Sequence, residues 1–410
     1  MTHSLASLPF GRCSPLGLRT ALVAFAAASG AALPAMEITA DYHVPFTPEN
    51  AILGYFSPTK KPTLVVKSGA VVAIDGGGGI RYNRGGTAAA AAPAVAAAPG
   101  AAAPSAGGIP PIPSVEWVDN WLKENHIATT VATCPALAET LKVMKEAYRP
   151  KEVLGGGHLL SGPIYVEDAE PGDMLEIRIL DVTPRIPYGT VGGSPGGGAL
   201  PAETKRPFSY VVPLDLKRNA GVFDDKVEVP LAPFMGVMAT CPADSEGPFR
   251  RSGPPGAFGG NLDCKYLSAG STLYLPVFQK GALFYTGDSH AAQGDGEVTV
   301  NAIETADTCT LQFILHKGHS LKMPRAETAT HYITFGLDPD LNLAMHQAIL
   351  ETIEFLKEKE GYDFFRAYAL TSIGIDFHVT QDVDKTNGIH GMIPKRLFIN
   401  DHNTYWYHPF

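Results

Sequence analysis

Short runs in which hydrophobic and polar residues alternate dominate the chain from residue 156 onward. Residues 174–182 alternate Leu175, Ile177 and Ile179 with Glu176 and Arg178. A period of two predicts a β-strand that is buried on one face. The same period recurs at residues 273–277, 298–302 and 311–315, and residues 62–74 contain two further short apolar runs. The pattern therefore predicts a protein built mostly of short strands.

Helical spacing appears in two places. Residues 116–148 contain two stretches with apolar residues three or four apart. Nearer the C-terminus, the Asp338-Pro339-Asp340 sequence predicts a helix that Asp338 caps and Pro339 begins, and that ends at Gly361. A short helix at 364–370 and a strand with alternating apolar residues at 373–379 are expected to follow.

Together these elements predict an α+β fold that is predominantly β, with a sandwich-like or barrel-like body and a small C-terminal α/β module. The predicted segments are a signal peptide at 1–35, an N-terminal β segment at 36–85, an Ala/Pro/Gly-rich flexible insertion at 86–113, a β-rich body at 114–335, and the C-terminal module of the same domain at 336–410. The insertion is predicted to be flexible because its composition offers nothing to bury.

The first 35 residues have the layout of a signal peptide. They contain no acidic residue, carry Arg12 and Arg19, and then continue through an apolar run to small residues at 30–35. A transit peptide or an unstructured start would share some of these features. The protein is expected to be periplasmic or secreted if this leader is cleaved, and cytoplasmic otherwise. No segment approaches the roughly 20 consecutive apolar residues of a stable membrane span.

Composition narrows the classes of partner. The 43 Gly and 34 Pro residues indicate many turns, and 32 Lys and Arg against 41 Asp and Glu give a net charge of −9. A chain this acidic lacks the basic surface that nucleic-acid binding needs, so a small molecule is the expected partner. Beyond the leader, Cys134, Cys241, Cys264 and Cys309 form no CxxC pair, which leaves disulfides and buried thiols both open.

The densest group of chemically active side chains lies at residues 286–297, with the sequence TGDSHAAQGDGE. It contains Asp288 and His290, two residues apart, and Asp295 and Glu297, also two apart. In extended backbone each pair points to one face, and the intervening glycines permit close approach of a ligand. Histidine with carboxylates is a typical metal-binding set, whereas a solvated acidic turn is the simpler alternative.

Two smaller patches add candidates. Residues 259–263 place Gly260, Asn261 and Asp263 together, although an Asx turn would explain them as well, and His158 follows three glycines before a predicted strand. With the first group they supply enough nitrogen and oxygen donors for a metal site of three or four ligands, with a carboxylate left over as a base.

Several longer strings resemble the acetamidase/formamidase family over approximately residues 51–399. They include GGGHLLSGPIYVEDAEPGDMLEIRILDV, GGNLDCKYLSAGSTLYLPVF, TGDSHAAQGDGEV and IDFHVTQDVDKTNGIHGMIPK. The resemblance implies a β-rich fold with a smaller α/β part. It also implies a metal-assisted amidohydrolase that releases ammonia from short carboxamides and assembles as a homo-oligomer. Gly157, where proline is expected, and Ser161, where threonine is usual, depart from the family pattern.

The polar motifs of the family fall on residues that the patches had already indicated. We interpret His158, Asp263, Asp288 and His290 as ligands of a divalent metal, with Zn²⁺ expected and Ca²⁺ as an alternative second ion. Glu297 is the expected general base, and Asp295 would assist it by orienting a ligand or binding the metal itself. The expected contacts to substrate and oxyanion come from Asn261, Gly260 and Gly294.

Two rival functions stay open from the sequence. A serine or cysteine nucleophile would replace the metal, with Ser161, Ser289 or Cys264 as candidates, although none lies in a nucleophile elbow. An exported β protein that binds a small ligand without catalysis is the other. Histidines without an acid at ligand spacing are left outside the site, and these are His331, His346, His378 and His390, while His316 and His319 are expected in a solvated turn.

Overall fold

The structure is a computed structural model that describes residues 38–80, 112–150, 153 and 157–399. The predicted leader at 1–35 and nearly all of the predicted insertion at 86–113 lie outside these residues. All of the described strands and helices lie in one compact unit, Thr39–Phe410. No helix in the described part of the chain has the length and hydrophobicity needed to cross a membrane.

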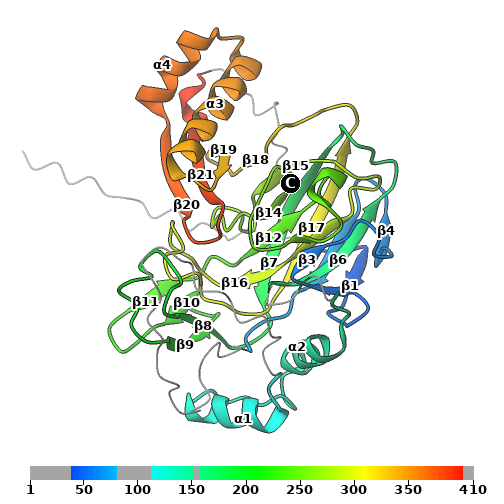
Figure 1. Cartoon of the computed structure of the whole chain (residues 1–410), viewed down its shortest axis with the longest axis vertical. Coiled ribbons are helices and arrows are strands. Elements are labelled where there is room, and N and C mark those ends of the chain that lie inside the picture. The colour runs from blue at the N-terminus through cyan, green and yellow to red at the C-terminus, as the bar shows by residue number, and fades with distance from the viewer. Residues whose placement is uncertain (1–37, 81–111, 151–152, 154–156, 400–410) are drawn as a thin grey trace, which may run out of the picture. The chain divides into compact units, whose positions relative to one another are not determined.

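Two large sheets account for most of the strands (Figure 1). In spatial order the nine-stranded sheet contains β1 (Tyr42–Val44), β5 (Val71–Asp75), β17 (Asp307–His316), β7 (Met174–Pro184), β15 (Thr272–Pro276), β18 (Arg325–Glu327), β19 (His331–Asp338), β21 (Asn387–Pro394) and β20 (Asp376–Gln381). The six-stranded sheet contains β14 (Gly259–Asn261), β12 (Phe234–Ala239), β16 (Phe284–His290), β6 (Leu159–Val166), β2 (Ala51–Leu53) and β4 (Leu64–Val66), the last paired with β6.

The remaining elements are smaller. A four-stranded sheet contains β11 (Glu228–Pro230), β10 (Ala220–Val222), β9 (Phe208–Asp215) and β8 (Tyr188–Gly193), and a two-stranded ladder pairs β13 (Arg250–Arg251) with β3 (Tyr55–Phe56). The helices are α1 (Val115–Glu124), α2 (Pro135–Glu146), α3 (Leu341–Glu360) and α4 (Phe364–Gly374). The predicted class, α+β and predominantly β, is confirmed.

The main core lies between the two large sheets. It joins apolar side chains of the nine-stranded sheet, such as Ile177 and Leu311, to those of the six-stranded sheet, such as Met238 and Phe284. Each such side chain stabilises the folded state by about 1.5–3 kcal/mol through its removal from water. Among the described strands the sheets have open ends, so the body is sandwich-like and is no closed barrel.

The alternation in β7 is deceptive, because its polar face is also covered. Glu176 is buried, and its carboxylate accepts a hydrogen bond of 2.6 Å from Arg178 and lies 2.6 Å from the ring of His316. Burial opposes ionisation of Glu176, but these hydrogen bonds outweigh it and lower the pKa of the carboxyl. The expectation that His316 lies in a solvated turn was therefore wrong.

Another predicted strand, at residues 298–302, is absent. These residues form turns and irregular backbone, with Val300 at a φ of 66° and Val298 largely exposed. A left-handed φ is incompatible with a strand, whatever the side-chain pattern. Conversely, residues 189–193 include three glycines and still form part of β8.

The first helix of the C-terminal module begins two residues later than predicted. Asp340, and not Asp338, caps α3 by accepting hydrogen bonds from the backbone N–H groups of Asn342 and Leu343. The helix ends at Gly361 in the left-handed conformation, as predicted. Helix α4 extends to residue 374, beyond its predicted end at 370, and β20 follows it.

The four cysteines beyond the leader are all buried and free. Cys134, Cys241, Cys264 and Cys309 therefore form no disulfide in this structure. Of the two possibilities that the sequence left open, the structure has the buried thiols.

Helix α3 packs so closely on β19 that only glycine fits at residue 336. A Cβ atom there would lie 2.0 Å from the backbone oxygen of Ala344 and 2.4 Å from the nitrogen of Ala348. We expect Gly336→Ala to destabilise the protein by about 1–3 kcal/mol through overpacking. Gly253→Ala, where a Cβ atom would meet nothing within 4 Å, is the control. Thermal unfolding measures both, and equal midpoints for the two variants would contradict this packing.

Candidate functional site

A cavity of about 380 Å³ opens beside the ends of three strands of the six-stranded sheet. Its lining includes His158, which immediately precedes β6, Asn261 at the end of β14, and Asp288 near the end of β16. Glu297 lines the same cavity from the loop after β16. Residues that lie more than a hundred positions apart in the sequence therefore meet at one hollow.

His290 is the centre of the polar cluster behind this cavity. Its Nε2 atom lies 3.5 Å from the Oδ2 atom of Asp288 and 3.3 Å from the Oε1 atom of Glu304. Its Nδ1 atom lies 4.0 Å from the Oδ1 atom of Asp263, and the Nε2 atom of His158 lies 3.7 Å from Asp288. The imidazole is thus surrounded by carboxylates that come close without hydrogen bonding to it.

Two groups of side chains within this cluster could hold a metal ion. Asp263, His290 and Glu297 form one group and Asp288, His290 and Glu304 the other, and within each group the candidate ligand atoms lie within 4.8 Å of one another. Among the described residues, both ring nitrogens of His290 and both carboxylate oxygens of Asp263 are buried without a hydrogen-bond partner. Buried polar atoms are normally hydrogen bonded, so these unpaired nitrogen and oxygen atoms fit the chemistry of metal ligands.

A glycine on the neighbouring strand makes the convergence possible. Gly236 lies in β12, and a Cβ atom on it would be 2.5 Å from Asp263 Oδ1, 2.7 Å from Asp288 Oδ2 and 3.0 Å from the His290 ring. Any larger residue would occupy the space where the two carboxylates and the imidazole meet.

Three of the acidic residues have strained backbone. The φ angles of Asp263, Asp288 and Glu297 are 48°, 60° and 43°, in the left-handed region that residues with a side chain rarely adopt. Each such residue costs about 1–3 kcal/mol and persists only where the surroundings enforce it, which is typical of functional sites. The strain is evidence that this geometry is imposed by the fold and is not a solvated turn.

Burial and crowding shift the pKa values in the cluster. The pKa of Asp263 is raised well above its usual value by burial and by Glu297, and the pKa of Glu297 is raised chiefly by burial. Burial works against the charged forms of Asp288 and His290 as well. There His158 and His290 outweigh it and lower the pKa of Asp288, while Glu304 and Asp288 raise that of His290.

Two members of the cluster, Glu304 and Asp384, were not predicted from the sequence. Glu304 lies beside His290 because the chain turns at residues 298–301. The strand that was expected at 298–302 would not have brought it there. Asp384, in the turn between β20 and β21, accepts a hydrogen bond of 2.9 Å from Asn261 Nδ2, and burial raises its pKa to about 6. It falls within the string IDFHVTQDVDKTNGIHG, so the resemblance offered a signal that the local pattern did not.

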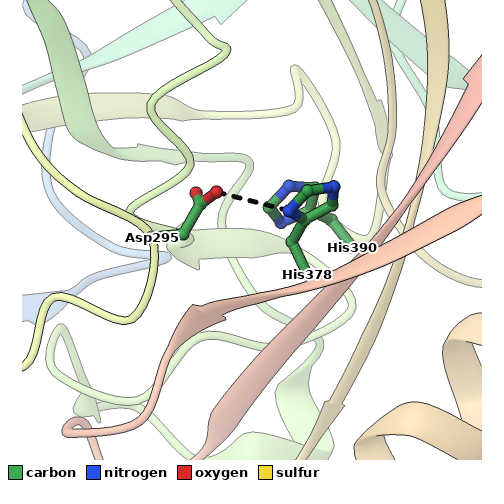
Figure 2. A group of neighbouring side chains, drawn as sticks. All are labelled: Asp295, His378 and His390. Carbon is green, nitrogen blue, oxygen red and sulfur yellow. Dashed lines mark ion pairs between the residues drawn. The ribbon is translucent and has the colours of Figure 1, made fainter.

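Asp295 does not share the cavity with Glu297, although the two were expected to point the same way. Its Oδ2 atom lies 2.9 Å from Lys265 Nζ and 3.5 Å from His378 Nδ1, in a separate group with His390 (Figure 2). The reason is the backbone, since Gly296 has a φ of 95° and the extended conformation that the prediction assumed is absent. His378 and His390, which the sequence analysis left outside the site, are thus near an acid after all.

Of the three predicted substrate-binding residues, only Asn261 lines the cavity. Its Oδ1 atom is buried without a partner among the described residues. Gly260 and Gly294 are not among the lining residues, and the backbone of Gly260 pairs with Met238 in the sheet. The glycines that do form the wall include residues 77–79, a run that the sequence analysis passed over.

The two departures from the family pattern both have structural roles. Gly157 has a φ of 133°, which proline cannot adopt, and a Cβ atom there would lie 2.3 Å from Gly54 Cα. Ser161 donates a hydrogen bond of 2.6 Å to the backbone oxygen of Asp75. Both residues fix β6 and its approach, and so help to place His158.

Comparison with known proteins gives a consistent result. The model of the acetamidase/formamidase family matches residues 110–246 and 245–400. The formamidase of Methylophilus methylotrophus is 28% identical over 329 residues, which cover 59% of this chain and 77% of that protein. The acetamidase of Mycolicibacterium smegmatis is 28% identical over 296 residues, which cover 52% of this chain and 72% of that protein.

Solved structures agree with the sequence comparison. The crystal structure of the acetamidase from Bacillus halodurans superposes with a TM-score of 0.65 and 26% sequence identity, covering 87% of this chain and 98% of that one. The similarity therefore extends over both the sandwich-like body and the C-terminal module.

Proposed function

Since the chain belongs to the acetamidase/formamidase family and is a hydrolase of the carbon–nitrogen bond in linear amides, we propose that it cleaves a short carboxamide with the help of a divalent metal ion. The observation that supports the metal is the set of orphaned, buried donors of His290 and Asp263 beside the carboxylate of Asp288. Carboxylates packed this closely need a positive charge among them to stay ionised.

His158, Asp263, Asp288 and His290 are the residues that would hold the ion. Their mixture of imidazole nitrogen and carboxylate oxygen suits Zn²⁺ better than Ca²⁺, which prefers oxygen alone. When bound, such an ion lowers the pKa of water and polarises the amide carbonyl. Glu304 is a further donor beside His290 that the fold supplies.

Glu297 is the residue that would move the proton. It lines the cavity, it is buried, and its carboxyl has a raised pKa, which are the properties of a group that takes a proton from water and passes it to the leaving nitrogen. The amide nitrogen is a poor leaving group until it gains a proton and can depart as ammonia, so amide cleavage requires a proton donor in this position.

Asn261 supplies a means of recognising a primary amide. Asp384 accepts a hydrogen bond from the Nδ2 atom of Asn261, which turns the unpartnered Oδ1 atom into the available acceptor. Because Asn261 lines the cavity, its Oδ1 atom is the one that would accept an N–H of the substrate's carboxamide. In this proposal Asn261 would contact the amide nitrogen and not the oxyanion.

The nucleophile candidates are poorly placed for covalent catalysis. Cys264 is buried, and burial raises the pKa of its thiol to about 12, which disfavours the reactive thiolate. Ser161 already donates to the backbone oxygen of Asp75. Ser289 lines the cavity, but its hydroxyl donates to the Met235 Sδ atom and accepts from the backbone nitrogen of Asp307, so no base among the described residues takes its proton. These contacts favour hydrolysis by water over a serine or cysteine enzyme.

We retain export and homo-oligomer assembly as proposals. Export rests on the leader pattern at residues 1–35, and assembly rests on the family resemblance. N-terminal sequencing of the mature protein and sedimentation of the purified chain test them separately.

Ammonia release from a panel of short amides tests the proposed reaction. We expect release from formamide or acetamide that falls after chelator treatment and returns when Zn²⁺ is added, because the buried donors need the ion. The untreated enzyme and a chelator-treated sample without added metal are the controls. Release that survives complete metal removal would contradict the metal and favour a nucleophile.

Glu297→Gln tests the proton transfer. The amide keeps the size of the side chain but cannot take a proton, so we expect kcat to fall by about 10²–10⁴-fold with metal content unchanged. Glu203→Gln, at an exposed loop position, is the matched control and should leave kcat alone. Loss of the metal from the Glu297 variant would instead identify Glu297 as a ligand.

Gly236→Ala tests whether the close convergence matters. The added methyl group would push apart Asp263, Asp288 and His290, so we expect amide hydrolysis to be lost while the sheet still folds. Gly197→Ala is the control, because Gly197 lines the same cavity and its Cβ would make only an ordinary contact of 3.5 Å. The value of kcat/KM measures the loss of activity in each variant, and circular dichroism checks that both variants fold. Full activity in Gly236→Ala would refute the proposed geometry.

A further inference from the structure

Two histidines face each other across the C-terminal hairpin, outside the cavity described above. His378 in β20 is the register partner of His390 in β21, and their rings stack with centroids 5.3 Å apart and planes 8° apart. Directly opposed residues in antiparallel strands hold their Cβ atoms about 4.5–5.5 Å apart, so both imidazoles project from one face of the hairpin. This pairing depends only on the hairpin register.

Asp295 completes a group of three from a different part of the chain. Figure 2 shows its carboxylate directed at the His378 ring, with His390 behind. One ligand atom from each of the three residues lies within 4.8 Å of the others. Two imidazoles and a carboxylate are a common ligand set for first-row transition metals.

The inner histidine is held as metal ligands usually are. The Nδ1 atom of His390 is hydrogen bonded to the hydroxyl of Thr380 at 2.8 Å, which fixes the ring. Its Nε2 atom is buried and has no partner in the described part of the chain. Leaving a buried polar atom unpaired costs about 1–3 kcal/mol, and metal-binding histidines characteristically anchor their second nitrogen in this way.

We propose that Asp295, His378 and His390 form a second binding site for a transition-metal ion such as Zn²⁺, distinct from the cluster around His290. Imidazole nitrogen favours Zn²⁺ over Ca²⁺ or Mg²⁺ at this position. His378 lines an open cavity of about 680 Å³ that Glu297 and Asp384 do not line, which gives an ion its own entry from solvent. The proposal does not rest on the proposed function.

Without an ion, Lys265 balances the negative charge of Asp295. Its ammonium lies 2.9 Å from Asp295 Oδ2 and 5.2 Å from the centre of the Tyr266 ring, and its side chain is 30% exposed. It neutralises Asp295 and competes with a metal for that carboxylate. Because the side chain reaches solvent, it can withdraw when an ion binds.

An ion here would brace the loop that leads into the candidate active site. The backbone N–H of Gly296 donates a hydrogen bond of 3.0 Å to the backbone oxygen of Thr380, and Gly296 also forms a β-bridge with Gln381. Glu297 follows Gly296 directly, and Asp384 lies three residues beyond Gln381. Tying Asp295 to β20 and β21 therefore secures the segments that carry Glu297 and Asp384.

Zinc stoichiometry of the full chain tests the proposal. The protein is stripped with chelator, titrated with Zn²⁺ alone, and the bound metal is counted by mass spectrometry. We expect His378→Ala/His390→Ala to lose one equivalent that Asp263→Asn retains. The matched control is His331→Ala, because His331 lines the same cavity but lies outside the group of three, and it should keep the wild-type count.

Lys265→Met provides a second test that removes no ligand. Loss of the competing ammonium is expected to lower the Kd of this site for Zn²⁺ by about tenfold, the scale of the interaction between partly exposed charges a few ångströms apart. The visible spectrum of bound Co²⁺ reports the same site, and the band lost from the double histidine variant should strengthen at lower Co²⁺ in the Lys265 variant.

The outcomes separate this proposal from the proposed function. An unchanged zinc count in the folded double variant, or an unchanged Kd in Lys265→Met, overturns the second site. A count that falls in the double variant but not in Asp263→Asn supports the second site and counts against a metal at His290. Should the double variant fail to fold by circular dichroism, His378→Gln alone, at a partly exposed position, is expected to weaken zinc binding by at least about tenfold, and an unchanged affinity overturns the proposal.

Discussion

Burial of several carboxylates around one imidazole is the constraint on which the site depends. Burial opposes the charged form of each of Asp263, Asp288 and Glu297, and mutual repulsion makes it costly for all three to be ionised together without a compensating cation. The left-handed backbone at all three residues shows that the fold holds them against local preference. Under the proposed function, a divalent ion would supply the positive charge that offsets the repulsion among these carboxylates.

The sheet supplies the rigidity that this arrangement requires. Strand β12 lies between β14 and β16, so the residues that follow or end those two strands flank it, and Gly236 leaves room for them. Beneath them, the apolar core between the two large sheets resists any relaxation that would move the carboxylates apart. The six-stranded sheet that contributes to the core therefore also positions these polar side chains.

The loop after β16 connects two polar groups with different surroundings. Glu297 faces the cavity with His158, whereas Asp295 faces the C-terminal hairpin and Lys265. The side chains of Asp295 and Glu297 diverge at Gly296, whose backbone pairs with β20. The C-terminal module therefore contributes to the candidate active site through Asp384 and through the pairing of its strand β20 with this loop, although its two helices do not line the cavity.

The sequence by itself determined the class of fold, most of the strands whose apolar residues alternate, both C-terminal helices and the Asp288–His290 pair, because these depend on contacts between near neighbours. It also determined the family, since several motifs in order are specific where one is not. Tertiary structure decided the rest. Glu304 and Asp384 join the cluster only because turns at 298–301 and 382–386 bring them back to His290 and Asn261, and a positive φ at Gly296 separates Asp295 from Glu297. Likewise, His378 and His390 meet through strand register, and no local spacing encodes a partner that lies across a hairpin or the conformation of a single glycine.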